Sequence, residues 1–270
     1  WWTGAVDDDR RFGLPGFGPS TYGDSFADVY DDWYADLGDG DVIRALADLL
    51  PARPARVLEL GVGTGRMLEA LADLRRDTAD DLVGIDSSPA MLDRARARLG
   101  DRATLLEGDF SRFLPAGRFD LVFAGWNTFF NLPDDDALAS CLGLVSGALD
   151  DDSVFLFDAV VPRGGSADHV GVRSMTADRV VLSVSRLDTA SRRITGQFVE
   201  LADGAPPRLR PWSVRWWTSD EIAAASSSAG LTVAALWSDG TGTPFDESSE
   251  RMVVQLRRTA PHEEASRVVS

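Results

Sequence analysis

The chain has 270 residues, of which 44% are hydrophobic, and this suits one elaborated α/β domain with a sizeable core better than two domains. Its formal net charge of −16 disfavours DNA and RNA as substrates, because polyanions are repelled and the sequence shows no basic patch. No apolar run reaches the ~18 to 20 residues that a membrane helix requires, and no signal-peptide pattern is present. The basic residues are all arginine, which with abundant Ala, Asp and Gly points to a GC-rich bacterial genome; we expect a bacterial cytoplasmic protein.

The N-terminal part of the chain predicts an arm followed by two helices. Residues 1–20 are rich in glycine and proline and are expected to form a flexible arm. Helices are expected at about 25–37 and 41–50, and Pro51 and Pro54 separate the second of them from the first strand.

The most informative segment is VLELGVGTGRM, residues 57–67, where an apolar strand runs into a glycine-rich turn and then into a helix. Gly61, Gly63 and Gly65 lack the Cβ atoms that would keep a nucleotide ligand away from the backbone amides of the turn. A dinucleotide-binding turn needs its third glycine where this chain has Arg66, and Glu59 is unexpected two residues before the first glycine. The turn therefore predicts a cofactor site that departs from the dinucleotide pattern.

Three further strand ends follow in order. The segment 82–92, LVGIDSSPAML, reads as a buried strand ending at Asp86, and Ser88 and Pro89 open the next helix. Asp86 lies 21 residues after Gly65, a spacing at which a βαβ unit places an acid to accept hydrogen bonds from ribose hydroxyls. The third strand ends in EGDF, residues 107–110, and the fourth strand reads FDLVFAGWN, residues 119–127.

Over residues 55–160 these four segments resemble the first four motifs of class I S-adenosylmethionine-dependent methyltransferases, and the chain is similar to bacterial small-molecule members such as amino-sugar N,N-dimethyltransferases. The resemblance implies a doubly wound, Rossmann-like, seven-stranded sheet, with S-adenosylmethionine as cofactor and S-adenosylhomocysteine as product. It also implies that Asp109 faces the adenine amino group, that Phe110 or Met91 covers the ring, and that residues 124–127 line the methionine and methyl end. The cofactor-binding residues expected in this way are Glu59, Gly61, Gly63, Gly65, Asp86, Ser87, Met91, Asp109, Phe110, Ala124 and Gly125.

The pattern changes after the expected fifth strand, residues 153–161. Short β-like runs, VVLSVSRLD, RRITGQFVEL and LRPWSVRWW, predict an antiparallel β insertion over 164–217. A helix with a capping box formed by Thr218 and Glu221 follows, and LTVAALWSD and RMVVQLRR supply two final strands. We therefore expect a methyltransferase domain over 21–258 that contains this insertion, and a disordered tail over 259–270.

The core motifs specify the methyl donor, so the acceptor must be argued from other residues. Trp126, Asn127 and Phe130 follow the fourth strand and are expected to line the acceptor cavity. Asp158, at the end of the fifth strand, is either a substrate-facing acid or a hydrogen-bond acceptor that supports the site from behind. The tryptophans at 212, 216 and 217 are expected to divide between the core and the cavity.

Two side chains are candidates for a direct part in the reaction. In the family that this chain resembles, the N-terminal helix closes over the donor, often with a tyrosine near the methyl end, and Tyr30 is the tyrosine that we choose here. His169 is the one histidine outside the tail, near a Gly164-Gly165 hinge, and is either a general base on a mobile lid or an ordinary surface histidine.

No HxH, HxxxE or CxxC cluster predicts a metal site, and Cys141 falls in an expected helix as a small buried hydrophobe. AGWN stands where methyltransferases acting on planar base or amide nitrogens have (D/N/S)PP(Y/F). We therefore expect N-methylation of an amine on a small molecule or short peptide in bacterial specialised metabolism. The alternatives are O- or C-methylation of a natural product and a non-catalytic adenosyl-ligand-binding partner protein; the acceptor stays open, and so does the oligomeric state, with a homodimer as one alternative.

Overall fold

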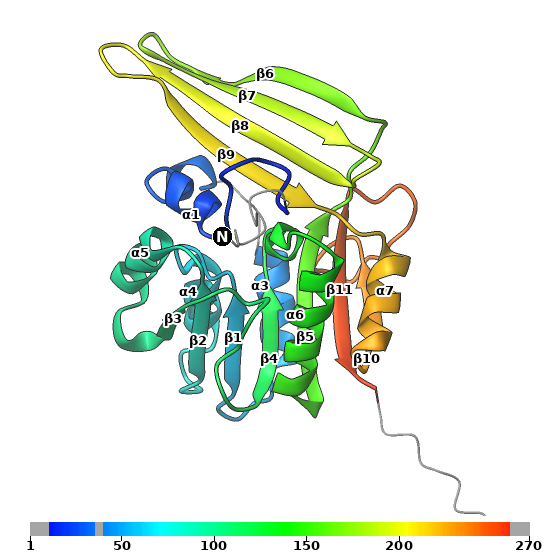
Figure 1. Cartoon of the computed structure of the whole chain (residues 1–270). Helices are drawn as coiled ribbons and strands as arrows, with labels where there is room; N and C mark the ends of the chain where they lie inside the picture. Colours follow the sequence, from blue (N-terminus) through cyan, green and yellow to red (C-terminus); the bar gives the residue numbers. More distant parts are fainter. Residues whose placement is uncertain (1–10, 36–39, 260–270) are drawn as a thin grey trace, which may run out of the picture.

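The computed structural model of this protein describes residues 11–35 and 40–259. They form a seven-stranded sheet in the order β10-β11-β5-β4-β1-β2-β3 and a four-stranded sheet in the order β6-β7-β8-β9 (Figure 1). In the large sheet all pairs are parallel except those that β11 makes with β5 and β10. This confirms the predicted doubly wound, Rossmann-like sheet of seven strands. Its strands are β1 (Arg56–Leu60), β2 (Asp81–Asp86), β3 (Thr104–Glu107), β4 (Phe119–Ala124), β5 (Leu149–Val160), β10 (Leu231–Trp237) and β11 (Arg251–Arg258).

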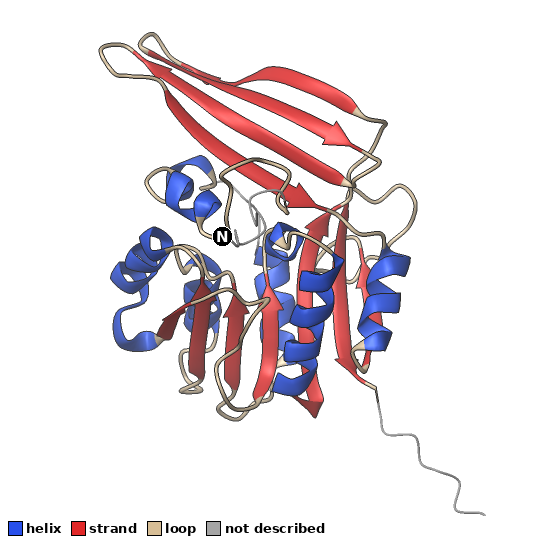
Figure 2. Ribbon diagram, viewed as in Figure 1, coloured by secondary structure: helices blue, strands red, loops and turns tan. Residues whose placement is uncertain are grey.

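Helices cover both faces of the large sheet (Figure 2). They are α3 (Gly40–Leu49), α4 (Arg66–Leu74), α5 (Pro89–Leu99), α6 (Asp135–Ala148) and α7 (Ser219–Ser228). Successive strand residues alternate between two cores: Leu58 and Val122 pack on the side of α6 and α7, whereas Val57 and Leu121 pack on the side of α3, α4 and α5. No described helix meets the length and hydrophobicity needed to cross a membrane.

Local capping explains where two of the helices begin. The Ser88 hydroxyl accepts a hydrogen bond from the amide of Met91, with Pro89 at the first helical position, so α5 begins at the predicted residue. At the start of α7 the predicted capping box is present, because Thr218 and Glu221 satisfy each other's backbone amides.

The N-terminal region differs from its prediction. The expected helix 25–37 is two short helices, α1 (Thr21–Phe26) and α2 (Tyr30–Trp33), because the turn between them carries Asp28, whose carboxylate pairs with Arg208 and Arg210 of the insertion. The predicted arm is in part well packed, since Phe12 and Phe17 are only 7% and 5% exposed. Residues 1–10, 36–39 and 260–270 lie outside the described part of the chain. The first half of the predicted arm, the end of the helix expected at 25–37 and all of the predicted tail except Thr259 fall in these ranges.

The predicted β insertion is present as the four-stranded sheet, which lies across the carboxyl ends of the core strands with α1 beneath it (Figure 1). One strand, β6, precedes the three predicted β-like runs. We call the face that meets α1 the inner face: there the Arg210 guanidinium donates to the Ser25 carbonyl, and the Phe198 ring lies 5.8 Å from the ring of Phe26. The strands are β6 (Ala167–Met175), β7 (Arg179–Asp188), β8 (Arg193–Ala202) and β9 (Arg208–Arg215).

Candidate functional site

The glycine turn after β1 is fixed by the carboxylate at the end of β2. One oxygen of Asp86 accepts the Gly63 amide at 2.8 Å, and the other accepts the Ser88 amide at 2.8 Å. Gly61 has a φ of +65°, and a Cβ atom there would lie 2.3 Å from the methyl carbon of Thr128. Only glycine therefore lets the segment after β4 approach the turn this closely.

Two adjoining hollows at this edge of the sheet form what we call the donor cleft. They share Tyr30, Gly61, Gly63 and Thr128. One hollow includes Asp86 with the apolar walls that could hold an adenosine, and the other includes Glu59 and could hold the amino-acid end of the cofactor. Of the predicted cofactor-binding residues, the cleft brings together Glu59, Gly61, Gly63, Asp86, Ser87, Met91, Phe110 and Gly125.

Three predicted cofactor-binding residues do not line the cleft. Gly65 is the residue before α4, at a φ of +80°, and Ala124 is buried in the core. The carboxylate of Asp109 accepts hydrogen bonds from the amide and hydroxyl of Ser111 at 2.8 and 2.7 Å. In the structure the Asp109 carboxylate therefore stabilises the turn after β3, in which it accepts these hydrogen bonds from Ser111.

The short N-terminal helices are held over the donor cleft by hydrogen bonds to its motifs. The Ser88 hydroxyl donates to Asp24 of α1 at 2.6 Å, and the Thr64 hydroxyl of the glycine turn donates to Asp31 of α2 at 2.7 Å. Arg98 of α5 completes the second contact, because its guanidinium lies 2.9 Å from Asp31 and also donates to Thr64. The cover and the cleft are therefore one hydrogen-bonded unit.

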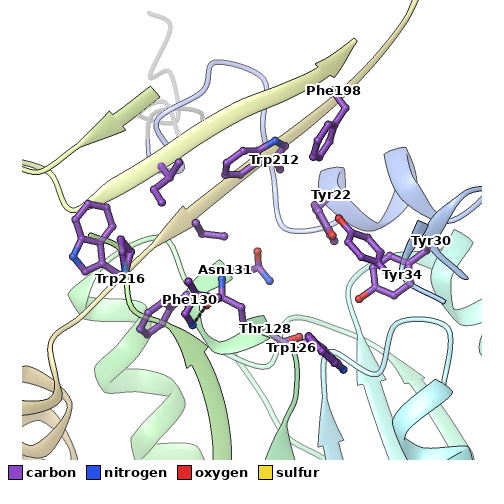
Figure 3. Close-up of a pocket in the computed structure, with 15 residues that line it drawn as sticks. Tyr22, Tyr30, Tyr34, Trp126, Thr128, Phe130, Asn131, Phe198, Trp212 and Trp216 are labelled. Carbon is purple, nitrogen blue, oxygen red and sulfur yellow. Dashed lines mark hydrogen bonds between the residues drawn. The ribbon is translucent and has the colours of Figure 1, made fainter. Parts of the chain in front are cut away.

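A larger cavity of about 440 Å³ adjoins the donor cleft, between the inner face of the insertion and the segment after β4 (Figure 3). Within the described part of the chain its lining contains no charged side chain. The wall is largely aromatic, and its polar side-chain groups are three tyrosine hydroxyls, three tryptophan indole N–H groups, two asparagine amides and one threonine hydroxyl. The lining residues are Tyr22, Tyr30, Tyr34, Trp126, Asn127, Thr128, Phe130, Asn131, Val160, Pro162, Ile194, Phe198, Trp212, Val214 and Trp216.

Tyr30 and Thr128 line both hollows of the donor cleft and also the large cavity. They therefore mark the passage between the two spaces. Figure 3 shows Tyr30 and Tyr34 side by side, with ring centroids 4.9 Å apart, and the ring of Tyr22 lies edge-on to Tyr30 at 6.4 Å. Burial raises the pKa of both Tyr30 and Tyr22 above the usual tyrosine value, so both phenols stay protonated near neutral pH.

The segment after β4 is strained and is held by β5. Trp126 and Asn127 have φ values of +53° and +61°, which non-glycine residues rarely adopt. Asp158 accepts the Trp126 amide at 2.7 Å, and the amide of Val160 donates to the Asn127 side chain at 3.0 Å. Asp158 is 3% exposed, pairs with Arg251 and does not line the cavity. Of the two roles predicted for it, the structure therefore favours the hydrogen-bond acceptor that supports the site over the substrate-facing acid.

Of the other predicted site residues, Trp126 and Phe130 line the cavity, whereas His169 does not. Trp126 lines both the donor cleft and the cavity, with the guanidinium groups of Arg66 and Arg251 each 5.5 Å from its ring. Phe130 lines the cavity while its ring also packs on the buried Trp217 at 5.7 Å. His169 lies on β6, the outermost strand of the insertion, is exposed, and does not line the cavity.

Thr128, Asn131 and Phe198 are lining residues that the sequence interpretation did not single out. A signal for the first two was available, because WNTFFNL directly follows the fourth strand, at the edge where ligands bind in such sheets. Phe198 could have been placed only with the register of β8, which decides which alternate residues face inward.

A mostly parallel sheet with a glycine turn and an acidic strand end at its carboxyl edge is typical of enzymes that bind nucleotide-like cofactors. Comparison with known proteins identifies the class. A family model described as a methyltransferase domain matches residues 57–147. The structure of the CcbJ methyltransferase from Streptomyces caelestis is 32% identical, covers 90% of this chain and 100% of that chain, and superposes with a TM-score of 0.81. The chain belongs to the S-adenosylmethionine-dependent methyltransferases, and S-adenosylmethionine is its cofactor.

Three further proteins are similar to this chain. Aclacinomycin 10-hydroxylase RdmB of Streptomyces purpurascens is 30% identical over 98% of this chain, and the chain spans 65% of that relative's length. The SAM-bound amino pentose methyltransferase CalS10 from Micromonospora echinaspora is 24% identical, covers 86% of this chain and 97% of its own, and has a TM-score of 0.65, which shows a shared fold. The chain also spans only 53% of an uncharacterized methyltransferase of Geobacillus thermodenitrificans.

The first prediction concerns the donor. Asp86→Ala should weaken binding of S-adenosylhomocysteine by about 1.5 to 3 kcal/mol, because charged hydrogen bonds to the ribose and to Gly63 are lost. Asp93→Ala is the matched control, since this aspartate side chain is 76% exposed and pairs with Arg96 on α5. Calorimetry measures both variants and the affinity for NAD. Tighter binding of NAD than of S-adenosylhomocysteine, or unchanged binding in Asp86→Ala, would contradict the assignment.

The second prediction concerns the support behind the cavity. Asp158→Ala should lower the free energy of unfolding by about 2 to 4 kcal/mol, because the Trp126 amide and the Arg251 guanidinium lose their buried partner. Asp151→Ala, on the same strand but 78% exposed, should change it by less than about 0.5 kcal/mol. Urea titration measures both. Equal stability of the two variants would mean that Asp158 does not hold the strained segment.

Proposed function

We propose that the protein transfers a methyl group from S-adenosylmethionine to an amine nitrogen of a small, partly apolar acceptor or short peptide in bacterial specialised metabolism. The observation that carries this proposal is the cavity itself: an aromatic space opens onto the donor cleft at Tyr30 and Thr128, and its lining offers no carboxylate, histidine or arginine among the described residues.

An amine acceptor can react in a cavity whose wall offers no side chain to act as a base. The nitrogen lone pair attacks the methyl carbon, the carbon–sulfur bond breaks, and its electron pair stays on sulfur, which gives S-adenosylhomocysteine and a methylated ammonium. The ammonium then loses a proton to solvent. A neutral amine therefore needs no positioned base. Its orientation in a water-poor space can lower the activation barrier by up to ~7 to 11 kcal/mol in favourable cases.

An unactivated alcohol or carbon acid makes a different demand, because it must lose a proton during the reaction. Tyr30 and Tyr22 are not available as bases, since burial raises the pKa of both phenols and keeps them protonated. Aromatic faces, in contrast, attract a cationic product. The net charge of −16 adds a field that favours the approach of a cationic sulfonium and an ammonium.

The named relatives support a natural-product setting and leave the reaction to experiment. CalS10 acts on an amino pentose, which is consistent with an amine acceptor, although its likeness to this chain supports the fold alone. RdmB carries the name of a hydroxylase, so product analysis must distinguish the gain of one methylene unit from the gain of one oxygen atom.

The third prediction tests the methylated atom. With methyl-labelled S-adenosylmethionine and a panel of amino sugars, amines, phenols and carboxylic acids, label should enter amines, and mass spectrometry should place the methyl group on nitrogen. At fixed substrate concentration, turnover should rise with pH as the acceptor ammonium deprotonates. Label on oxygen or carbon contradicts the amine assignment, and donor binding without any turnover favours a non-catalytic partner.

Tyr30→Phe refines this test. In the unmodified protein the phenol of Tyr30 stays protonated over the assay range, because burial raises its pKa. The rise of turnover with pH should therefore be the same in the variant. The rate should fall by about tenfold, the equivalent of one lost hydrogen bond near the methyl group. A pH profile that shifts in Tyr30→Phe would show instead that Tyr30 exchanges the proton.

The fourth prediction is that turnover requires neither a metal nor a thiol. The described residues contain no group of three or more potential metal ligands, and Cys141 is fully buried in α6, where burial raises the pKa of its thiol. Activity should survive EDTA and the Cys141→Ala change, apart from the stability cost of a small cavity. Loss of turnover in EDTA with the fold intact by circular dichroism would contradict the proposed chemistry.

A further inference from the structure

The insertion bounds a second cavity, of about 520 Å³, on the face of β8 and β9 that is turned away from the large cavity. Ile194 and Val214 line the large cavity, whereas Arg193, Thr195 and Arg215 line the second one, because alternate residues of a strand point to opposite faces. The sheet itself therefore separates the two spaces. We call the second space the arginine pocket, and its lining residues are Arg11, Gly13, Pro133, Asp134, Arg186, Asp188, Ala190, Ser191, Arg192, Arg193, Thr195 and Arg215.

Cationic side chains dominate this pocket, although the net charge of the chain is −16. Five of the twelve lining residues are arginines and two are aspartates, so the lining has an excess of positive charge. Four of the arginines also pair with a carboxylate, and three of these carboxylates, Asp135, Asp168 and Glu221, lie outside the lining. A guanidinium has five N–H donors, so an arginine that pairs with one carboxylate can still donate to a ligand.

The fifth arginine, Arg193, lies opposite another cation. It is paired in register with Arg215 across β8 and β9, and like charges in directly opposite positions destabilise a sheet. The hydrogen-bond partners of the Arg193 guanidinium within the described residues are neutral oxygens: the carbonyls of Arg11 and Pro133 and the hydroxyl of Ser213. A bound anion would relieve the repulsion between the two guanidinium groups.

The electrostatics of these two arginines agree with that geometry. Burial and the charge of Arg215 lower the pKa of Arg193, whereas the carboxylate of Asp134 opposes the shift. The Nε atom of Arg215 is buried and has no hydrogen-bond partner in the described part of the chain. An unpaired buried donor of this kind is costly, so the pocket gains stability from a ligand that accepts hydrogen bonds.

We propose that the arginine pocket binds a phosphate group, and that its occupation strengthens binding of the cofactor in the donor cleft. The guanidinium groups reach the pocket from the N-terminal segment, β7, the turn after β7, β8 and β9. A phosphate group has three strong acceptor oxygens and a charge of about −1.5 to −2 near pH 7, whereas a carboxylate is planar and has two oxygens. Donors that converge from several directions therefore favour phosphate. The volume also leaves room for an organic part of a phosphate ester.

The pocket and the donor cleft are joined by one segment of chain, which carries the proposed effect on the cofactor. Arg193 donates to the carbonyl of Arg11 and Ser213 donates to the carbonyl of Phe12, while the Phe12 side chain lines the donor cleft. A Cβ atom at Gly13 would collide with the Arg193 side chain, so the segment packs directly on this arginine. An anion that fixes Arg193 therefore also fixes Phe12 at the cleft, and such coupling between two sites is reciprocal. The inference rests on the cofactor and not on the proposed acceptor.

The experiment is calorimetry on the full chain with inorganic phosphate and with glucose 6-phosphate, at an ionic strength held constant with NaCl. We expect one saturable site with a Kd on the order of 0.1 to 1 mM. Affinity for S-adenosylhomocysteine should rise by about fivefold when the pocket is saturated. Tighter binding of glucose 6-phosphate identifies a phosphate ester as the occupant, and equal affinities identify free phosphate; both support the proposal. No saturable binding below about 10 mM, competition of phosphate with S-adenosylhomocysteine, or an unchanged affinity for S-adenosylhomocysteine would overturn it.

Variants locate the site. Arg193→Gln and, at an exposed position that folding tolerates, Arg186→Gln should each weaken phosphate binding by about tenfold, because charge-assisted hydrogen bonds are lost. Arg96→Gln is the matched control, since Arg96 also pairs with one aspartate but lies on α5, away from the insertion. Circular dichroism shows that each variant is folded. If Arg193→Gln does not fold, Arg186→Gln decides. Phosphate binding that is unchanged in the folded pocket variants, or weakened equally in Arg96→Gln, would overturn the proposed site while leaving the methyltransferase reaction untouched.

Discussion

The carboxylate of Asp86 is the interaction on which the rest of the site depends. It joins two consecutive strand-to-helix turns, because one oxygen accepts the Gly63 amide and the other accepts the Ser88 amide. The turn that receives the cofactor is thereby fixed to the start of α5. Ser88 in turn donates to Asp24, so the position of α1 over the cleft follows from the same carboxylate. Burial raises the pKa of Asp86, and its two amide partners oppose that rise by favouring the charged form.

The large cavity, which we propose for the acceptor, depends on a second, longer-range interaction. Arg210 is 1% exposed and pairs with Asp28 of the α1–α2 turn and with Glu200 of the neighbouring strand. Only the arginine of these ion pairs is buried, since the Asp28 and Glu200 side chains are 40% and 17% exposed. The cost of desolvating the guanidinium offsets much of the attraction, but a displaced carboxylate would leave a buried charge unpaired. Arg210 therefore fixes where the inner face lies relative to α1, and so it determines which aromatic side chains meet across the cavity.

The donor half of the site could be predicted from the sequence because its determinants are local. A glycine turn, an acid at the next strand end and a Ser-Pro helix start each act within a few residues, and eight of the eleven predicted cofactor-binding residues line the cleft. The failures have distant causes. The helix expected at 25–37 breaks because Asp28 pairs with residues about 180 positions away, and the orientation of Asp158 depends on Arg251, 93 positions along the chain. The place of His169 depends on β6 being an outermost strand, which only the strand order reveals.

Strand register in the insertion decides which side chains face the cavity proposed for the acceptor and which face outward. Ile194, Phe198 and Trp212 face the cavity, while Val199 and Leu209, between or beside them in sequence, face outward. Because side chains alternate strictly along a strand, a slip of one residue would exchange these two sets and bring the outer residues into the cavity. The sequence of β8 and β9 is thus constrained on both faces at once, by the cavity on one side and by the outward-facing side chains on the other. An acceptor preference can change by substitution at inner positions alone, provided that the register, which both faces share, is kept.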